Sequence, residues 1–310
     1  MALHAWFLVG PTAVGKSAVA QWLAEKRKAT LVSADSMLVY RGMDIGTAKP
    51  SPAERGEVPY WGLDCVEPDQ SFSVGDYLRS LAGLAQAESS GRPLIVVGGT
   101  GLYIDCLLRG LTSRPPPDLL ERARLESLHR QGGVPALQAE VERLAPGRLA
   151  ELADPRNPRR LIRAIELAHQ GVLSKTMLQR GPPKPRLTGL RMDPAQLAGR
   201  IARRVQTMYH QGLLEEARAL RGRYPALSET ARQAIGYAEA WQVLDGTLAP
   251  SAAQEITARR TRQLAKRQLT WFRHQADMAW IEAEPGATVA RIAASVEAQW
   301  ELDGPTTLQL

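Results

Sequence analysis

A glycine-rich run of eight residues near the amino terminus constrains the fold of this chain more than any other feature. Residues 10–17 read Gly-Pro-Thr-Ala-Val-Gly-Lys-Ser and match the pattern Gly-x4-Gly-Lys-Ser/Thr. The run follows the apolar segment Ala5–Gly10, which we predict to be a buried strand, and it opens a predicted helix over Lys16–Arg27. A strand, a glycine loop and a helix in this order distinguish a phosphate-binding loop from a chance glycine turn.

This loop has the chemistry needed to hold a di- or triphosphate. Successive backbone N–H groups at a helix N-terminus form a nest for anions. Lys16 adds a mobile positive charge, and the Ser17 hydroxyl is placed to ligate Mg²⁺. The motif does not say which phosphate compound binds. The residues expected to contact it are Gly10, Pro11, Thr12, Ala13, Val14, Gly15, Lys16 and Ser17, with Ser17 also expected to be the metal ligand.

Two further apolar runs indicate that the loop belongs to a parallel sheet. Thr30–Ala34 and Leu94–Val97 read as strands, and the helical segment Val74–Glu88 precedes the second of them. Strands that alternate with helices predict an α/β fold, here a P-loop NTPase-like parallel sheet core flanked by helices. Ligands of such sheets bind beyond the carboxyl ends of the strands. The loops expected there are residues 10–17, 35–40 and 98–103.

Proline clusters bracket a separate segment in the middle of the chain. Residues 115–117 and 182–185 are proline-rich, and only helical patterns lie between them: Leu119–Arg130, Val134–Leu144 and Pro158–His169. We therefore predict an all-helical insertion over residues 114–186, and an α/β core made of residues 1–113 and 187–310. Beyond Leu187 we expect helices only, over Ala195–Ala219, Ser228–Leu244 and Ala252–His274, with a frayed end from about Gly304.

Composition excludes several classes of protein. Hydrophobic residues make up 44% of the 310 residues and charged residues 23%, as in a folded globular chain. Cys65 and Cys106 cannot build a disulfide scaffold or a four-cysteine zinc site, and a reducing compartment fits them. The apolar run Ala5–Val9 is too short for a signal-peptide core, and no run reaches the ~18 residues of a membrane span. We expect a cytoplasmic monomer with no membrane partner.

The net charge of +7 is concentrated in one stretch of the chain. Residues 156–224 carry 15 basic and 4 acidic groups, whereas residues 1–155 and 225–310 each have a net charge of −2. A second basic block, residues 256–274, contains no acid. At ~100° per residue, Arg259, Arg262, Lys266 and Arg273 would share one face of a helix. A single charged run is often only a solvated surface, but two unbalanced runs favour a polyanionic partner such as nucleic acid.

Asp35 is the strongest candidate for chemistry beside the loop. The strand Leu94–Val97 ends in Gly98 instead of the Asp that holds Mg²⁺ in ordinary P-loop NTPases, whereas Thr30–Ala34 ends in Asp35. Asp35 could be a magnesium ligand or a base for a substrate nucleophile, or its carboxylate could serve only as a helix cap. Arg200 and Arg204 would share a helical face and could stabilise a leaving pyrophosphate, or could be surface residues. Four arginines also surround a helix start that favours phosphate: Arg156, Arg159, Arg160 and Arg163.

Several motifs occur together in a distinctive order. They are residues 10–17, 33–36, 40–50 (Tyr-Arg-Gly-Met-Asp-Ile-Gly-Thr-Ala-Lys-Pro), 98–103 (Gly-Gly-Thr-Gly-Leu-Tyr), 235–237 and 265–271 (Ala-Lys-Arg-Gln-Leu-Thr-Trp). From about residue 5 to about residue 280 the chain closely resembles bacterial tRNA dimethylallyltransferases, also called tRNA isopentenyltransferases. This family transfers a dimethylallyl group from dimethylallyl diphosphate to the exocyclic amine of the adenosine immediately 3′ of the anticodon, in tRNAs that read codons beginning with U.

The resemblance implies roles for individual residues. The loop would hold prenyl diphosphate with Mg²⁺ as the cofactor, Asp35 would be the general base, Thr100 would touch the reacting centre, and Arg204 would lie on the pyrophosphate side. The positions that match tRNA-gripping stretches of the family are Asp35, Ser36, Met37, Leu38, Thr100, Arg122, Arg159, Arg160, Leu161, Ile162, Arg163, Gln233, Gly236, Tyr237, Lys266, Arg267, Gln268 and Arg273. Val14, Leu38 and Ala238 depart from residues common in the family, which weakens the case for contacts by these side chains.

Three alternatives remain at the level of sequence. A small-molecule P-loop kinase would turn over ATP and would need no basic middle stretch. A nucleic-acid-binding module with a vestigial loop would bind RNA without transfer. An enzyme that prenylates free AMP is disfavoured, because one nucleotide cannot neutralise so many basic groups.

Overall fold

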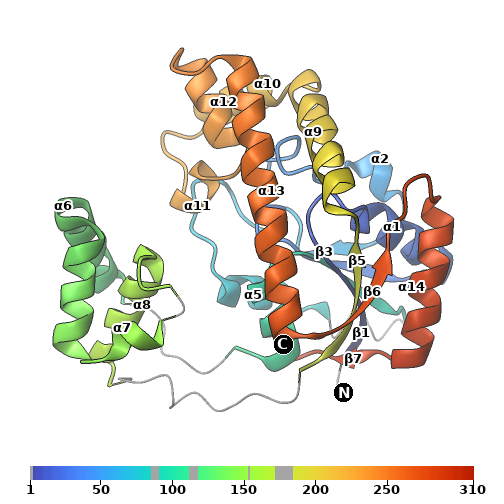
Figure 1. The fold of residues 1–310 in the computed structure, drawn as a ribbon, viewed down its shortest axis with the longest axis horizontal. Helices are drawn as coiled ribbons and strands as arrows, with labels where there is room; N and C mark the ends of the chain where they lie inside the picture. Colours follow the sequence, from blue (N-terminus) through green and yellow to red (C-terminus); the bar gives the residue numbers. More distant parts are fainter. Residues whose placement is uncertain (1–2, 85–90, 112–117, 153, 172–183) are drawn as a thin grey trace. The chain divides into compact units, whose positions relative to one another are not determined.

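We describe a computed structural model of the chain, which covers residues 3–84, 91–111, 118–152, 154–171 and 184–310. It divides into two compact units. Met1–Gly110 and Pro183–Leu310 form the larger one, the core unit, and Leu111–Pro182 forms the smaller one, the helical unit (Figure 1). Within the described residues, no helix is long and apolar enough to cross a membrane.

The core unit is built on one sheet with the strand order β3-β2-β4-β1-β5-β6, in which all neighbours run parallel. A short strand, β7, pairs with β1 in the antiparallel direction. The strands are β1 (His4–Val9), β2 (Thr30–Ala34), β3 (Tyr60–Trp61), β4 (Leu94–Gly98), β5 (Arg186–Arg191), β6 (Asp277–Glu282) and β7 (Thr306–Thr307).

Helices cover both faces of this sheet, so its central strands are apolar on both sides. In β4, Leu94 and Val96 pack into one hydrophobic core, and Ile95 and Val97 pack into the other. This burial on both faces explains why β2 and β4 read as continuous apolar runs. Within the described residues of the core unit, the helices are α1 (Lys16–Arg27), α2 (Pro52–Arg55), α3 (Val74–Ser80), α5 (Gly101–Arg109), α9 (Pro194–His210), α10 (Leu213–Arg223), α11 (Glu229–Arg232), α12 (Tyr237–Leu244), α13 (Pro250–Gln275) and α14 (Val289–Asp303).

The expectation of helices only beyond Leu187 is wrong. Strands β5 and β6 extend the sheet past β1, and α14 follows them. Residues 186–191 read Arg-Leu-Thr-Gly-Leu-Arg, and the arginines at both ends and the central Thr-Gly hide a strand whose middle is fully buried. The expected fraying from Gly304 is also wrong, because β7 pairs with β1 and the Leu308 N–H donates to the Leu3 carbonyl at 2.7 Å.

Two predicted long helices are each divided at a glycine. The pattern over Ala195–Ala219 belongs to α9 and α10, which are separated by Gly212 at φ +101°. The pattern over Ser228–Leu244 belongs to α11 and α12, with Gly236 at φ +95° before α12. A positive φ costs glycine little, so each glycine redirects the chain without disturbing the apolar periodicity on either side.

The helical unit contains α6 (Leu119–Leu144), α7 (Arg148–Glu151) and α8 (Pro158–His169). The predicted break between the first two helical patterns is present as a non-helical Gly133 inside α6. Helix α8 begins as predicted, with the Asn157 side chain accepting from the Arg159 and Arg160 N–H groups. Leucine, isoleucine and valine side chains of α6 and α8 form the unit's own small core.

Candidate active site

The glycine loop between β1 and α1 adopts backbone conformations that few side chains tolerate. Gly10 lies at φ +142°, and a Cβ on it would come within 2.4 Å of the Leu190 carbonyl oxygen in β5. Gly15 lies at φ +106° directly before α1, and no described side chain caps that helix. The first N–H groups of α1 therefore remain available to an anion, as the sequence pattern predicts.

Lys16 lies buried at the base of this loop. Its ammonium group donates to the Pro11 carbonyl at 2.7 Å. Burial lowers the pKa of Lys16 from 10.5 to about 8; the Asp35 carboxylate opposes this shift and the Arg204 guanidinium adds to it. An incoming diphosphate would supply the negative charge that the ammonium lacks, so binding would stabilise the protonated form of Lys16.

This pKa makes anion binding sensitive to pH. Lys16 is mostly protonated at pH 7 and mostly neutral at pH 9 in the free protein. If the bound state keeps the ammonium charged, pyrophosphate affinity should fall about tenfold over this range. The ligand also titrates, so the matched control is Lys16→Arg, whose guanidinium stays charged throughout. Calorimetric titrations at several pH values would contradict the prediction if the two proteins lost affinity in parallel.

A cavity of about 740 Å³ lies in front of the loop, entirely within the core unit. It brings the predicted phosphate-side residues together with the predicted base: Lys16, Ser17, Asp35 and Arg204 all line it. Arg200 and Arg203 of α9 and Leu38 line it as well. The cavity therefore combines an anion-binding loop and several cations with three acidic residues, Glu25, Asp35 and Glu54, of which Asp35 directly follows a strand of the sheet.

Asp35 and Thr100 are fixed by the ends of two neighbouring strands. Asp35 directly follows β2, and its Oδ1 accepts from the Met37 N–H at 2.9 Å. Thr100 follows β4; its N–H donates to the Ala34 carbonyl at 3.1 Å, and its hydroxyl oxygen accepts from the Ser36 N–H at 3.0 Å. These bonds hold the two side chains at the edge of the sheet where ligands of parallel sheets bind.

The same strand ends explain why β4 finishes in glycine. A Cβ on Gly98 would lie 2.2 Å from the Ala34 carbonyl oxygen, and backbone atoms cannot move away as a flexible side chain can. No side chain therefore fits at this position while β2 and β4 remain paired. Asp35 is left as the carboxylate at this end of the two strands, in agreement with the sequence.

Arg204 and Arg200 project from α9 toward the loop. An Arg204 Nη2 donates to the Thr47 carbonyl at 3.2 Å. Desolvation lowers the pKa of Arg204, Asp35 raises it, and Arg200 lowers it further. The nearest Arg200 nitrogen lies 3.5 Å from the point where a Cβ on Gly15 would stand, so this guanidinium lies against the phosphate loop. Both arginines are thus available to a bound diphosphate.

Gln268 connects α13 to the phosphate loop. Its side chain is buried, and its Oε1 accepts from the Thr12 N–H at 2.8 Å. A Cβ on Gly99 would come within 2.4 Å of the Gln268 Nε2, so this amide fits only against a glycine. The resemblance predicts a tRNA contact at this position, and in the structure the Gln268 side chain lines the cavity and holds the loop.

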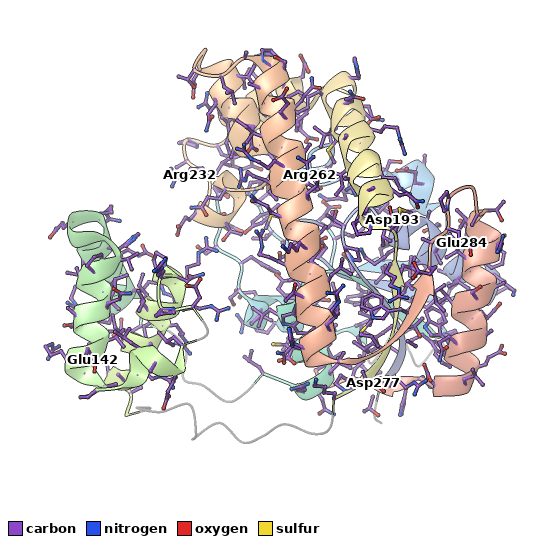
Figure 2. The ribbon with its side chains drawn as sticks, viewed as in Figure 1. Glu142, Asp193, Arg232, Arg262, Asp277 and Glu284 are labelled. Carbon is purple, nitrogen blue, oxygen red and sulfur yellow. The ribbon has the colours of Figure 1, made fainter. Side chains whose placement is uncertain are left out.

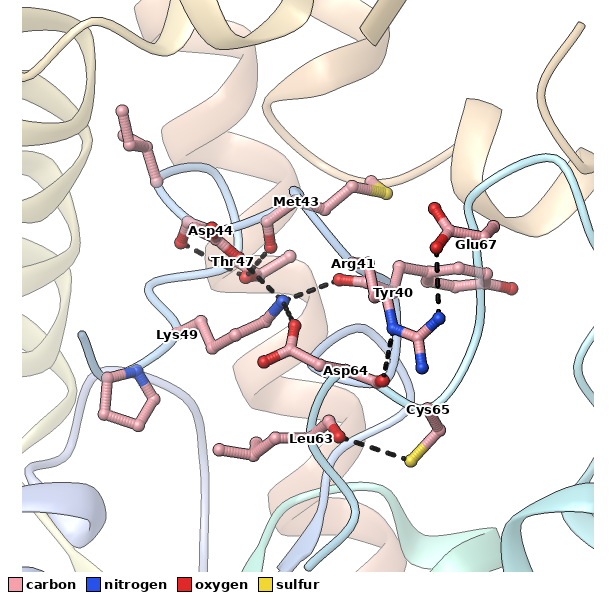
Figure 3. A network of polar contacts seen from close by, with 12 residues as sticks. Tyr40, Arg41, Met43, Asp44, Thr47, Lys49, Leu63, Asp64, Cys65 and Glu67 are labelled. Carbon is pink, nitrogen blue, oxygen red and sulfur yellow. Dashed lines mark hydrogen bonds and ion pairs between the residues drawn. The ribbon is translucent and has the colours of Figure 1, made fainter. Parts of the chain in front are cut away.

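Lys49 is a site-forming residue that has no role in the sequence interpretation. Its buried ammonium donates to the Tyr40 carbonyl and to Asp64, both at 2.6 Å, and pairs with Asp44 at 2.7 Å (Figure 3). This cation ties together the loop of residues 40–50, which supplies Thr47 and Ala48 to the cavity wall. In the sequence, Lys49 stands out only as part of the distinctive run of residues 40–50, which gives it no individual role.

The basic stripe on α13 faces outward. All four side chains of the stripe, Arg259, Arg262, Lys266 and Arg273, are exposed, and Arg262 is labelled in Figure 2. Arg267 is also exposed, on a neighbouring part of the helix surface. Arg260 lies elsewhere, because it pairs with Glu239 and donates to the Gln233 carbonyl. Tyr237 is fully buried, so this position offers no side chain to RNA; Gln233 and Gly236 precede it in the turn before α12.

The predicted RNA positions of the helical unit have different environments. Arg159 and Arg160 are exposed at the start of α8. Arg122 binds the buried Glu166 through two hydrogen bonds of 2.7 and 3.0 Å, and Arg163 donates to the same carboxylate at 2.9 Å. Leu161 and Ile162 pack in the core of the unit, so these two positions support their neighbours and offer no side chain to RNA.

Comparisons with known proteins identify the family of this chain. The family model described as IPP transferase matches residues 38–275. The tRNA dimethylallyltransferase of Deinococcus radiodurans is 40% identical over 274 residues, covering 86% of this chain and 89% of the relative. That of Methylococcus capsulatus is 40% identical over 302 residues, covering 94% and 96%. The crystal structure of the tRNA isopentenylpyrophosphate transferase from Bacillus halodurans superimposes with a TM-score of 0.67 at 35% identity, covering 96% of each chain. By sequence and by structure, this chain belongs to the IPP transferase family.

Proposed function

We propose that this protein transfers a dimethylallyl group from dimethylallyl diphosphate to the N6 amine of an adenosine in tRNA. The acceptor is the adenosine immediately 3′ of the anticodon in tRNAs that read codons beginning with U, and the products are isopentenyladenosine and diphosphate. The observation that carries the proposal is the cavity that Lys16, Arg204 and Asp35 line together, in which the Asp35 carboxylate acts electrostatically on both cations. The names of the relatives support the choice of both substrates.

On the donor side, the P-loop NTPase-like loop of residues 10–17 holds the diphosphate. As the bond between the allylic carbon and oxygen breaks, negative charge develops on the leaving oxygens. The N–H groups at the start of α1, together with Lys16 and Arg204, stabilise that charge in the transition state. The buried position of Lys16 strengthens this effect, because little solvent screens it.

On the acceptor side, Asp35 takes the proton of the adenine amine as the new C–N bond forms. An aromatic amine is a weak nucleophile, so a carboxylate within hydrogen-bonding reach lowers the barrier. Thr100, whose hydroxyl is oriented by Ser36, contacts the reacting groups. The adenosine must leave its stack in the anticodon loop to reach this cavity, which costs a few kcal/mol of binding energy.

The residues at the loop fit a magnesium ion that binds together with the diphosphate. Among the described residues, no three His, Cys, Asp or Glu side chains converge on a metal site. Mg²⁺ commonly uses one or two protein oxygens and completes its shell with substrate phosphates and water. Ser17 would supply a protein oxygen here, and Mg²⁺ would neutralise part of the diphosphate charge.

RNA binding rests on two basic surfaces, one on each unit. We propose that the stripe on α13 binds the phosphates of the anticodon stem-loop. We also propose that the insertion of residues 114–186 contacts tRNA through Arg159 and Arg160, with Arg122 and Arg163 held by Glu166 beside them. Because tRNA carries many phosphate groups, its binding accounts for the positive charge that is gathered in residues 156–224.

One transfer assay distinguishes this function from the alternatives. The protein is incubated with Mg²⁺, labelled dimethylallyl diphosphate and one of three acceptors: an anticodon stem-loop with the target adenosine, the same stem-loop with that adenosine replaced by guanosine, or free AMP. Label in the first RNA alone supports the proposal. Label in AMP, or ATP turnover without label in RNA, would contradict it.

The salt dependence of RNA binding tests the basic surfaces. Each phosphate contact that is lost should make the slope of log K against log salt shallower by about 0.7–0.9. We expect Arg159→Ala and Lys266→Ala to weaken stem-loop binding and to reduce the slope by about this amount. The matched control is Arg291→Ala on α14, which pairs with Glu284 and should leave the slope unchanged. Equal slopes in all four proteins would make Arg159 and Lys266 ordinary surface residues.

A further inference from the structure

Glu216 on α10 makes an unusual set of contacts with a loop far away in sequence. Its carboxylate accepts hydrogen bonds from the backbone N–H groups of Asp44 (3.1 Å), Ile45 (2.9 and 3.1 Å) and Gly46 (3.3 Å). The Tyr237 hydroxyl of α12 donates to the same carboxylate. Three consecutive N–H groups that converge on one anion form a nest, here occupied by a side chain of the protein itself.

The packing around this contact leaves no room for a side chain at Gly46. A Cβ on Gly46 would lie 2.4 Å from the Tyr237 ring and 2.9 Å from Leu213, so the loop backbone rests directly on these side chains. Burial and the neighbouring Glu216 charge raise the pKa of Tyr237, which keeps its hydroxyl protonated and able to donate. The loop is thus fixed in position from the side of α10 and α12.

The loop leads from this anchor to the cavity. Thr47 directly follows the three anchored residues, and its carbonyl accepts from Arg204 at 3.2 Å. Lys49 holds the other end of the loop through Asp64 and the Tyr40 carbonyl. A guanidinium that is held at a backbone carbonyl has its direction set by that carbonyl, so the position of residues 44–47 determines where Arg204 points.

We propose that Glu216 is a positioning residue that sets Arg204 for the diphosphate by fixing residues 44–47. The same carboxylate accepts from Tyr237, at the end of the turn whose residues Gln233 and Gly236 the family resemblance assigns to tRNA. It therefore joins the RNA side of the core unit to the arginine on the diphosphate side. This inference rests on the proposed function, because it gives Arg204 a diphosphate to bind.

The test compares two identical substitutions at adjacent positions. Glu216→Gln keeps the shape of the side chain but removes its charge. It also replaces one carboxylate oxygen, which accepts hydrogen bonds, with an NH2 group, which can only donate them. Glu215→Gln alters its exposed neighbour and serves as the control. We expect Glu216→Gln to weaken the binding of inorganic pyrophosphate about tenfold in calorimetric titrations without RNA, and Glu215→Gln to leave it unchanged.

A double-mutant cycle separates positioning from general destabilisation. If Glu216 acts through Arg204, Glu216→Gln should cause little further loss of pyrophosphate affinity in an Arg204→Ala background. An equal tenfold loss in both backgrounds, or unchanged affinity in the single variant, would overturn the inference. Failure of the unaltered protein to bind pyrophosphate would instead overturn the proposed function, and the inference with it.

A gentler variant covers the case in which Glu216→Gln does not fold. Tyr237→Phe removes one hydroxyl and keeps the ring that packs on Gly46. We expect pyrophosphate binding to weaken about threefold, with the loss again disappearing in the Arg204→Ala background. Unchanged pyrophosphate affinity in a folded Tyr237→Phe protein would count against the role of Glu216.

Discussion

Asp35→Asn should reduce the rate of prenyl transfer by about 10²- to 10⁴-fold while RNA binding survives. The amide has nearly the shape of the carboxylate, and its oxygen can still accept from the Met37 N–H, so the loop after β2 should keep its conformation. It cannot accept the proton of the adenine amine. Single-turnover transfer from labelled dimethylallyl diphosphate to a bound stem-loop measures the chemical step directly.

The comparison needs a control that changes the same atoms elsewhere. Asp69 is exposed in the loop between β3 and α3, and Asp69→Asn removes an equal charge without touching the cavity. Its transfer rate should match that of the unaltered protein. A rate for Asp35→Asn within a few-fold of that value would show that Asp35 is not the base. In that case its contribution would be limited to the geometry of the two strand ends.

Lys16→Met should reduce both pyrophosphate affinity and transfer, the latter by about 10²- to 10³-fold. The ammonium is the buried positive charge at the base of the loop, and methionine keeps the apolar stem without it. The free energy of unfolding of Lys16→Met should not fall in parallel with its activity. Burial disfavours the protonated form of Lys16, and the variant has no such charge to bury. Thermal unfolding measured beside the transfer assay distinguishes these effects.

Lys26→Met provides the matched control, since Lys26 lies on the same helix and pairs with Glu297 away from the cavity. It should bind pyrophosphate normally and should lose at most a fraction of a kcal/mol of stability, as is usual for an exposed ion pair. If Lys16→Met transferred the prenyl group at the rate of Lys26→Met, the loop would not hold the reacting diphosphate.

The sequence predicts best those parts of the fold that depend on local pattern. The bounds of α1, β2 and α8 match the structure because each has an unambiguous signal: a glycine loop, an apolar run or an asparagine cap. Strands β5 and β6 were missed because their ends are charged, and neither has a long apolar run. Their burial depends on neighbouring strands and helices that are distant in sequence, which no local window contains.

The residues of the candidate site likewise differ in whether a local sequence pattern predicts them. Lys16, Ser17 and Asp35 follow from their positions after predicted strands, and the structure brings them to one cavity. Gln268 and Glu216 hold that cavity from positions 256 and about 170 residues away from the loops they bind. Their side chains accept hydrogen bonds from backbone N–H groups of these loops. Nearly every residue type has a backbone N–H group, so the sequence of a loop does not reveal such a contact. Long-range positioning residues therefore become visible only with coordinates.

The glycine at the end of β4 also limits how this chain can change its chemistry. A carboxylate there is what an ordinary nucleotide-hydrolysing P-loop enzyme would require, yet even a methyl group at Gly98 would overlap the backbone of β2. A single substitution at Gly98 cannot introduce this carboxylate, because β2 and β4 would first have to move apart where they pair. The prenyl-transfer chemistry is thus protected by main-chain geometry, and redesign toward nucleotide hydrolysis would have to begin with the spacing of the sheet.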